Sequence, residues 1–167
     1  MTPGPSQHGN ACAVDIDQRP PRRDDPIRVP ESIEGSGGLF IVDASWGEIN
    51  PLVLAPGVRT VGELEVIEHL KHRLPLVDTR LQDVYLRSTI PGARNLPHTE
   101  ILKRRDELDA DVETVFFCNG PQCAATPDAI HFLLDAQYPP KSILYYRGGM
   151  HDWMTLGLPI KTIHRSS

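Results

Sequence analysis

Residues 115–130 read VFFCNGPQCAATPDAI, and this stretch decides the fold. Its first three residues form a short apolar run with the character of a β-strand, and Cys118 follows directly. Small and turn-forming residues occupy positions 119–125. Thr126 is typical of a helix N-cap, Pro127 of the first helical position, and the acid that follows suits the first turn. The sequence therefore predicts a strand, a loop and a helix in immediate succession.

A thiol at the C-terminal end of a strand, beneath a loop that enters a helix, lies in a place suited to nucleophilic chemistry. Backbone N–H groups and the helix dipole stabilise negative charge there, which lowers a thiol pKa from about 8.5 toward neutrality. The other interpretation is a buried Cys that packs as a small hydrophobe. We predict that Cys118, at the floor of the loop, is the reactive thiol and that Cys123, on its rim, is secondary.

Length and composition predict a single globular domain with appendages. The chain has 167 residues, 40% of them hydrophobic, and a net charge of −5. This charge argues against a nucleic-acid surface, which needs a basic face. Three cysteines do not make a disulfide framework, and the two in the loop lack a second ligand pair for zinc, so we expect no metal and no cofactor. No apolar run approaches the roughly 18 residues of a membrane span, and no secretory signal precedes the domain, so a cytoplasmic location is expected.

The chain divides into three parts. Residues 1–38 are rich in Pro, Gly and charge, so we predict a flexible tail that is dispensable for folding. Residues 39–56 hold two apolar runs, Leu39–Val42 and Pro51–Leu54, joined through Trp46, and are expected to form a strand or hairpin that packs on the main domain. Residues 57–167 are expected to form the main domain.

From residue 57 onward, strand and helix patterns alternate. The first half is predicted to hold a helix opened by a capping box at 60–63, a strand at 74–77 ending at Asp78, a short helix near 84–85 and a strand at 93–96. A helix from Thr99 to about Leu108, a strand at 114–117 and a helix from 127 are expected to follow. The last predicted elements are a strand at 142–146, a tight turn at 148–149 and a short helix near 152–156 ending at Gly157. This alternation predicts an α/β fold with a mainly parallel central sheet and helices on both faces. Sites in such sheets lie at the C-terminal strand ends, where we place Asp78, Cys118 and Arg147.

Four segments in the same order resemble the single-domain rhodaneses, which are sulfurtransferases. They are Asp78-Thr79-Arg80 followed by Tyr85, Ile90-Pro91-Gly92-Ala93-Arg94-Asn95-Leu96-Pro97, Phe117-Cys118, and Gly148-Gly149-Met150-His151-Asp152-Trp153 with Gly157-Leu158-Pro159. The resemblance covers residues 57 to 162 and implies a rhodanese-like fold. It also implies that Cys118 carries sulfane sulfur as a persulfide from a small donor to a thiol or cyanide-like acceptor, which could be a protein.

The sequence departs from the rhodanese pattern in four places. Ser88-Thr89 stands where the family usually has Gly-His, and Val84 where it has an acid. Residues 119–125 contain no cation, although the family loop commonly carries one that binds the substrate anion. The loop is also longer than usual if the helix is capped at Thr126, and lengthened loops occur in related phosphatases of the cell-cycle type. Those phosphatases carry the loop Arg as well, so its absence counts against them.

The resemblance and the pattern together assign the site. The substrate-binding loop is expected to comprise Asn119, Gly120, Pro121, Gln122, Ala124, Ala125 and Thr126. Arg80 is expected to pair with Asp78 or with loop carbonyls, and Arg147 either to lean over the loop in place of the missing cation or to be a solvated surface residue. Cys123 either resolves the persulfide as a disulfide or is a bystander. Trp153 is expected to be a core anchor.

Two alternatives to sulfur transfer stay open at this stage. One is a non-enzymatic rhodanese-like module that senses redox state through a Cys118–Cys123 disulfide or binds a partner. The other is a phosphatase or arsenate reductase on the same fold. The missing loop cation also predicts that thiosulfate, a small dianion, is a poor donor.

Overall fold

The computed structural model describes residues 31–32, 34–35, 37, 40–41 and 49–163. The predicted tail up to residue 30 and Trp46 lie outside the described residues, as do Leu39 and Val42. The predicted domain boundaries at residues 38 and 56 stay predictions.

A five-stranded parallel sheet forms the centre of the fold. Its strands are β3 (Arg59–Val61), β4 (Leu76–Asp78), β5 (Arg94–Asn95), β6 (Thr114–Phe117) and β7 (Ile143–Tyr146), in the spatial order β3-β7-β6-β4-β5. β6 lies in the middle, and its four residues are buried. This matches the continuous apolar run in the sequence, because a central parallel strand is covered on both faces.

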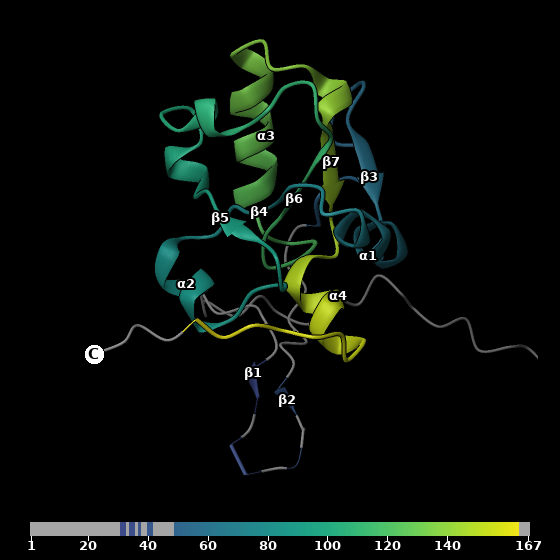
Figure 1. Cartoon of the computed structure of the whole chain (residues 1–167), viewed down its shortest axis with the longest axis vertical. Coiled ribbons are helices and arrows are strands. Elements are labelled where there is room, and N and C mark those ends of the chain that lie inside the picture. Colours follow the sequence, from purple (N-terminus) through teal and green to yellow (C-terminus); the bar gives the residue numbers. More distant parts are fainter. Residues whose placement is uncertain (1–30, 33, 36, 38–39, 42–48, 164–167) are drawn as a thin grey trace, which may run out of the picture.

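Helices cover both faces of the sheet (Figure 1). On one face Phe116 and Tyr145 pack against α3 (Ala125–Asp135) through Ile130 and Leu133. On the other face Phe117 and Tyr146 pack against α1 (Glu63–Lys71) and α4 (Gly149–Thr155). α2 (Gln82–Arg87) follows β4 and has no buried residue. The predicted α/β, rhodanese-like sheet with helices on both faces is confirmed.

Trp153 anchors α4, as predicted. Its side chain is buried, and its indole N–H donates to the Pro159 carbonyl over 2.7 Å. The ring meets Tyr146 edge to face, with centroids 6.3 Å apart. Trp153 thus connects the segment after α4 to β7.

Four predicted boundaries were wrong. Thr60 lies in β3 instead of capping α1, whose N-cap is Gly62, with the Glu65 carboxylate accepting from the Gly62 N–H at 2.7 Å. The helix expected from Thr99 is two short 3₁₀ turns, His98–Glu100 and Arg105–Glu107. α4 begins at Gly149, where a tight turn was expected. α3 begins at Ala125, two residues earlier than Pro127.

A two-residue antiparallel pair precedes the main sheet. β1 (Glu31–Ser32) pairs with β2 (Phe40–Ile41). The strand partner of β2 therefore lies within residues 1–38, which were predicted to be a flexible tail. Pro51–Leu54 forms no strand. Leu54 packs against the core on the α3 face, whereas Leu52 and Val53 are exposed.

Candidate active site

The candidate residues meet at the C-terminal edge of the sheet. Phe117 of β6 is in register with Asp78 of β4 on one side and with Tyr146 of β7 on the other. Cys118 and Arg147, each the residue after its strand, therefore lie at the same edge as Asp78. The expectation that these three would converge there is confirmed.

A buried ion pair forms the floor of the site, which we define as Asp78, Thr79, Arg80 and Thr89. The Arg80 guanidinium donates to both carboxylate oxygens of Asp78, with distances from 2.6 to 3.1 Å, and to the Ser88 carbonyl at 2.6 Å. Neither side chain is exposed by more than 2%. The Thr89 hydroxyl adds a 2.9 Å bond to Asp78. Thr89 thus completes the floor where the family pattern differs, and the predicted structural role of Arg80 is confirmed.

Two buried hydroxyls link the floor to α3. The Thr79 hydroxyl donates to the Phe117 carbonyl at 3.0 Å and lies 2.8 Å from the Thr126 hydroxyl. Thr126 is not the N-cap of α3, which is Ala124. Its position as the second residue of the helix instead aims its N–H and hydroxyl at the Cys118 sulfur.

The loop between β6 and α3 is shorter than the sequence suggested. Because α3 is capped by Ala124, only residues 119–124 separate Cys118 from the helix. The apparent lengthening, which favoured a phosphatase, came from placing the cap at Thr126. The length of the loop therefore does not favour a phosphatase.

Two outside segments clamp this loop, and we call residues 119–124 together with Asn50 the rim. Asn50 donates from its backbone N–H to the Pro121 carbonyl and from its side chain to the Cys123 carbonyl, each over 2.7 Å. From the other side, the first amides of α4 donate to Cys118 and Asn119 carbonyls at 3.0 and 2.8 Å. The rim is held largely through its own backbone carbonyls, and the Asn119 N–H at its start faces the Cys123 sulfur.

Gly149 permits this close approach. Its φ is +58°, and a Cβ there would meet the Cys118 carbonyl oxygen and lie 2.8 Å from the Gly120 nitrogen. Any larger residue would displace the loop backbone. The second Gly of the Gly-Gly pair is thus required by contact with the site.

The two loop thiols face each other and titrate as a pair. Cys118 is buried, and its thiol donates to the Cys123 carbonyl oxygen over 3.6 Å. Burial raises the pKa of Cys118 well above its ordinary value, and the neighbouring Cys123 adds to that rise. The expectation that the loop would lower the Cys118 pKa was wrong, because desolvation outweighs the Thr126 donors.

Cys123 holds the charge of the pair. The hydrogen bond from the Cys118 thiol lowers the pKa of Cys123 to about 6 against the opposing effect of burial. The N–H groups of Ala125 and Asn119 and the Arg80 guanidinium lower it further. Cys123 is also less buried than Cys118. The contact between the two residues therefore favours the thiolate on Cys123 over the thiolate on Cys118.

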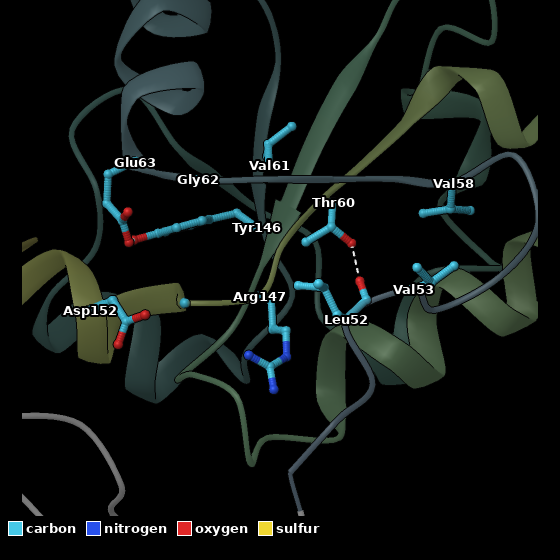
Figure 2. Close-up of a pocket in the computed structure, with 11 residues that line it drawn as sticks. Leu52, Val53, Val58, Thr60, Val61, Gly62, Glu63, Tyr146, Arg147 and Asp152 are labelled. Carbon is cyan, nitrogen blue, oxygen red and sulfur yellow. Dashed lines mark hydrogen bonds between the residues drawn. The ribbon is translucent and has the colours of Figure 1, made fainter.

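Arg147 neither covers the loop nor points freely into solvent. Its Nε donates to the Asn50 carbonyl at 2.8 Å, and the side chain is half-buried. Figure 2 shows it in a pocket of about 480 Å³, with Leu52 beside it and with Asp152 and the hydrogen-bonded Tyr146–Glu63 pair on the other side. Arg147 thus reaches the loop through Asn50.

Sequence reasoning missed Asn50, Thr79 and Thr89. Asn50 lies 73 residues from the Cys123 carbonyl that it binds, so no local pattern could reveal it. Thr79 lies between Asp78 and Arg80, which were both assigned to the site, and this position was the signal that could have revealed it. The Ser88-Thr89 departure was noticed, but the bond to Asp78 could not be inferred from it.

The family follows from comparison with known proteins. The model of the rhodanese-like domain matches residues 63–156, and the chain belongs to this family. It is 38% identical over 85 residues to the HTH-type transcriptional regulator Rv0324 of Mycobacterium tuberculosis, a match that covers 51% of this chain and 36% of that relative. The chain thus spans little more than a third of the length of that curated relative.

Solved structures show the same fold. A thiosulfate sulfurtransferase from Pseudomonas aeruginosa is 26% identical with a TM-score of 0.54, over 64% of this chain and 21% of that one. A rhodanese-related protein from Thermoplasma volcanium is 21% identical with a TM-score of 0.52, over 62% of this chain and 97% of that one. Among the described residues, no helix has both the length and the apolar character to cross a membrane.

Proposed function

We propose that the protein is a sulfurtransferase that carries sulfane sulfur as a persulfide on Cys118. The observation that carries the proposal is the loop itself: Cys118, hydrogen-bonded to Cys123, lies between the end of β6 and the amides at the start of α3. Thiolates attack sulfane sulfur, and aligned N–H groups stabilise the anions formed.

The proton of Cys118 is the first to move. The Cys118 thiol is hydrogen-bonded to Cys123, and a base must lie within hydrogen-bond reach of the proton that it takes. When the Cys123 thiolate accepts this proton, the charge passes to Cys118, where the N–H and hydroxyl of Thr126 receive it. Cys118 then attacks the outer sulfur of the donor, and the bond between that sulfur and the rest of the donor breaks. With thiosulfate the leaving group is sulfite, and with a persulfide it is a thiolate.

A thiol or cyanide-like acceptor completes the cycle. It attacks the outer sulfur of the Cys118 persulfide, and the Cys118 thiolate leaves. The acceptor is a small molecule or a protein thiol, and no nucleic acid takes part. The side chains expected to contact the donor are those of the rim, with Thr126 beneath them.

Donor preference follows from the charges around the loop. Residues 119–125 contain no cation, and Arg80 is already paired with Asp78. A missing charge-assisted hydrogen bond costs about 1.5–3 kcal/mol, or roughly one to two decades in affinity. Thiosulfate should therefore be a poorer donor than a less charged compound such as mercaptopyruvate or a persulfide.

Steady-state transfer to cyanide tests the proposal with all three donors. Wild-type protein should turn over, Cys118→Ser should not, and Cys12→Ser should match the wild type as the control. Arg147→Ala should weaken thiosulfate turnover further if the guanidinium leaves Asn50 to bind the dianion. Turnover that survives Cys118→Ser, or its absence with every donor, would contradict the proposal.

A further inference from the structure

The second thiol of the loop suggests an additional reaction of the site. Cys123 is one of two cysteines in the described residues, and it follows Cys118 by five positions in the same loop. The Cys118 sulfur lies 3.6 Å from the Cys123 carbonyl oxygen, so the Cys118 thiol contacts Cys123 directly. Any sulfur added to Cys118 therefore forms within reach of a second nucleophile.

We propose that Cys123 resolves the Cys118 persulfide, which releases hydrosulfide and leaves a Cys118–Cys123 disulfide. The inference rests on the proposed function, because it needs the persulfide to form. It gives the protein a second activity, reductive release of sulfide, beside transfer to an external acceptor.

The step balances in atoms and electrons. The Cys123 thiolate attacks the inner sulfur of the persulfide, the Sγ of Cys118. A bond forms between the two cysteine sulfurs, and the bond to the outer sulfur breaks. The outer sulfur takes the electron pair and leaves as HS⁻, so it is reduced while Cys123 is oxidised. A dithiol reductant then returns both cysteines to thiols by disulfide exchange and is itself oxidised to a disulfide.

The loop is held in the arrangement that this step needs. Asn50 fixes the Cys123 carbonyl, and the first amides of α4 fix the carbonyls of Cys118 and Asn119. The Cys123 N–H also donates to the Gly120 carbonyl at 3.0 Å, which closes a turn within the loop. With both ends clamped, the two sulfurs stay close without a large backbone movement.

The ionisation of the pair favours Cys123 as the attacking group. Its pKa of about 6 makes it mainly thiolate at neutral pH, and an attacking thiol is most effective when its pKa is near the ambient pH. The absence of a loop cation in residues 119–125 works in the same direction, because no positive side chain of the loop retains the departing anion.

The test uses full-length protein with Cys12→Ser, in which Cys118 and Cys123 are the only thiols. The reduced protein receives excess thiosulfate or, in a parallel series, one equivalent of glutathione persulfide, without acceptor. Intact mass and free sulfide are followed over time. We expect a gain of one sulfur atom, then its replacement by a loss of two hydrogens, with one sulfide released for each disulfide. A peptide map should place the disulfide between Cys118 and Cys123.

Cys123→Ser and Cys123→Ala in the same background are the matched variants. In either one that folds, sulfur should be gained more slowly because the base is gone, but once gained it should persist, and sulfide release should fall to the level of a protein-free control. If the sulfur persists equally long with Cys123 present, the resolving role is overturned while the proposed transferase function stands. If no variant gains sulfur from either donor, the proposed function fails and the inference falls with it.

Discussion

The floor and the rim of the site are held together by different kinds of contact. The floor rests on a fully buried ion pair and on hydroxyls from adjoining strands and loops. The rim has no ion pair in the described residues, and Asn50 and α4 hold it by its backbone carbonyls. The difference teaches that the floor should determine stability, whereas the rim should determine the chemistry of the two thiols.

Breaking the floor should have the largest effect on stability. Arg80→Met leaves the Asp78 carboxylate buried without its cation, which costs about 3–5 kcal/mol. The free energy of unfolding from urea titration measures this loss. The control is Lys71→Gln, which breaks an exposed pair with Glu68 and should leave the midpoint almost unchanged. Equal effects of the two variants would show that the floor is not a structural core.

The contact between α4 and the loop should come next. Gly149→Ala combines a positive φ with a clash against the loop backbone, and Gly157→Ala has a φ of +69° with nothing within 4 Å. Both should pay the conformational cost of about 1–3 kcal/mol, and Gly149→Ala should lose about 1–3 kcal/mol more through overpacking. Urea titration compares them. Similar losses would mean that the loop yields to the added methyl group.

Loosening the rim should affect chemistry more than stability. Asn50→Ala removes one side-chain hydrogen bond, worth about 1 kcal/mol, because its backbone bond to Pro121 remains. The freed loop should hold the two sulfurs less closely, so sulfur transfer should fall by more than the small shift in unfolding suggests. Turnover and urea titration of the same variant measure the two effects. Unchanged turnover in a destabilised Asn50→Ala variant would show that the rim determines stability and not the chemistry of the thiols.

The smallest expected effect is a shift in the pH dependence of labelling. Because the pKa of Cys123 is lowered, its thiolate is present above about pH 6 and is lost as the pH falls below that value. Alkylation of Cys123 in Cys12→Ser protein should follow this midpoint. Cys118→Ala removes the donor thiol, so the midpoint should rise toward the ordinary value of about 8.5. A midpoint near that value before the substitution would contradict the described thiol pair.

The sequence predicts the sheet better than it predicts the site. β6 was placed at its observed bounds because Thr114 and the three consecutive apolar residues that follow it favour a buried central strand. The start of α3 was missed because Thr126 and Pro127 form a strong local capping signal, yet tertiary contacts use the Thr126 hydroxyl for Thr79 and Cys118 instead.

The chemistry of the thiols depends on information that no local pattern contains. The position of Cys118 at a strand end was read correctly, but its burial reverses the expected direction of its pKa. The thiolate is favoured on Cys123 through a hydrogen bond between side chains and through Arg80, which comes from the segment after β4. Only the folded arrangement shows which of the two sulfurs is ionised.

The most direct test of the account is to find the sulfur atom after reaction with a donor. Full-length Cys12→Ser, Cys123→Ser protein is treated with thiosulfate or glutathione persulfide, the remaining thiols are blocked, and peptides are mapped by mass. Because Cys123→Ser also removes the base for Cys118, the reaction is given time to reach its end point; the account then predicts one added sulfur on the peptide that contains Cys118, and its transfer to cyanide on addition of that acceptor. In the companion protein with Cys118→Ser, no stable sulfur should be found. Sulfur retained by Cys123 in that companion protein, or none on Cys118 in the first, would contradict it.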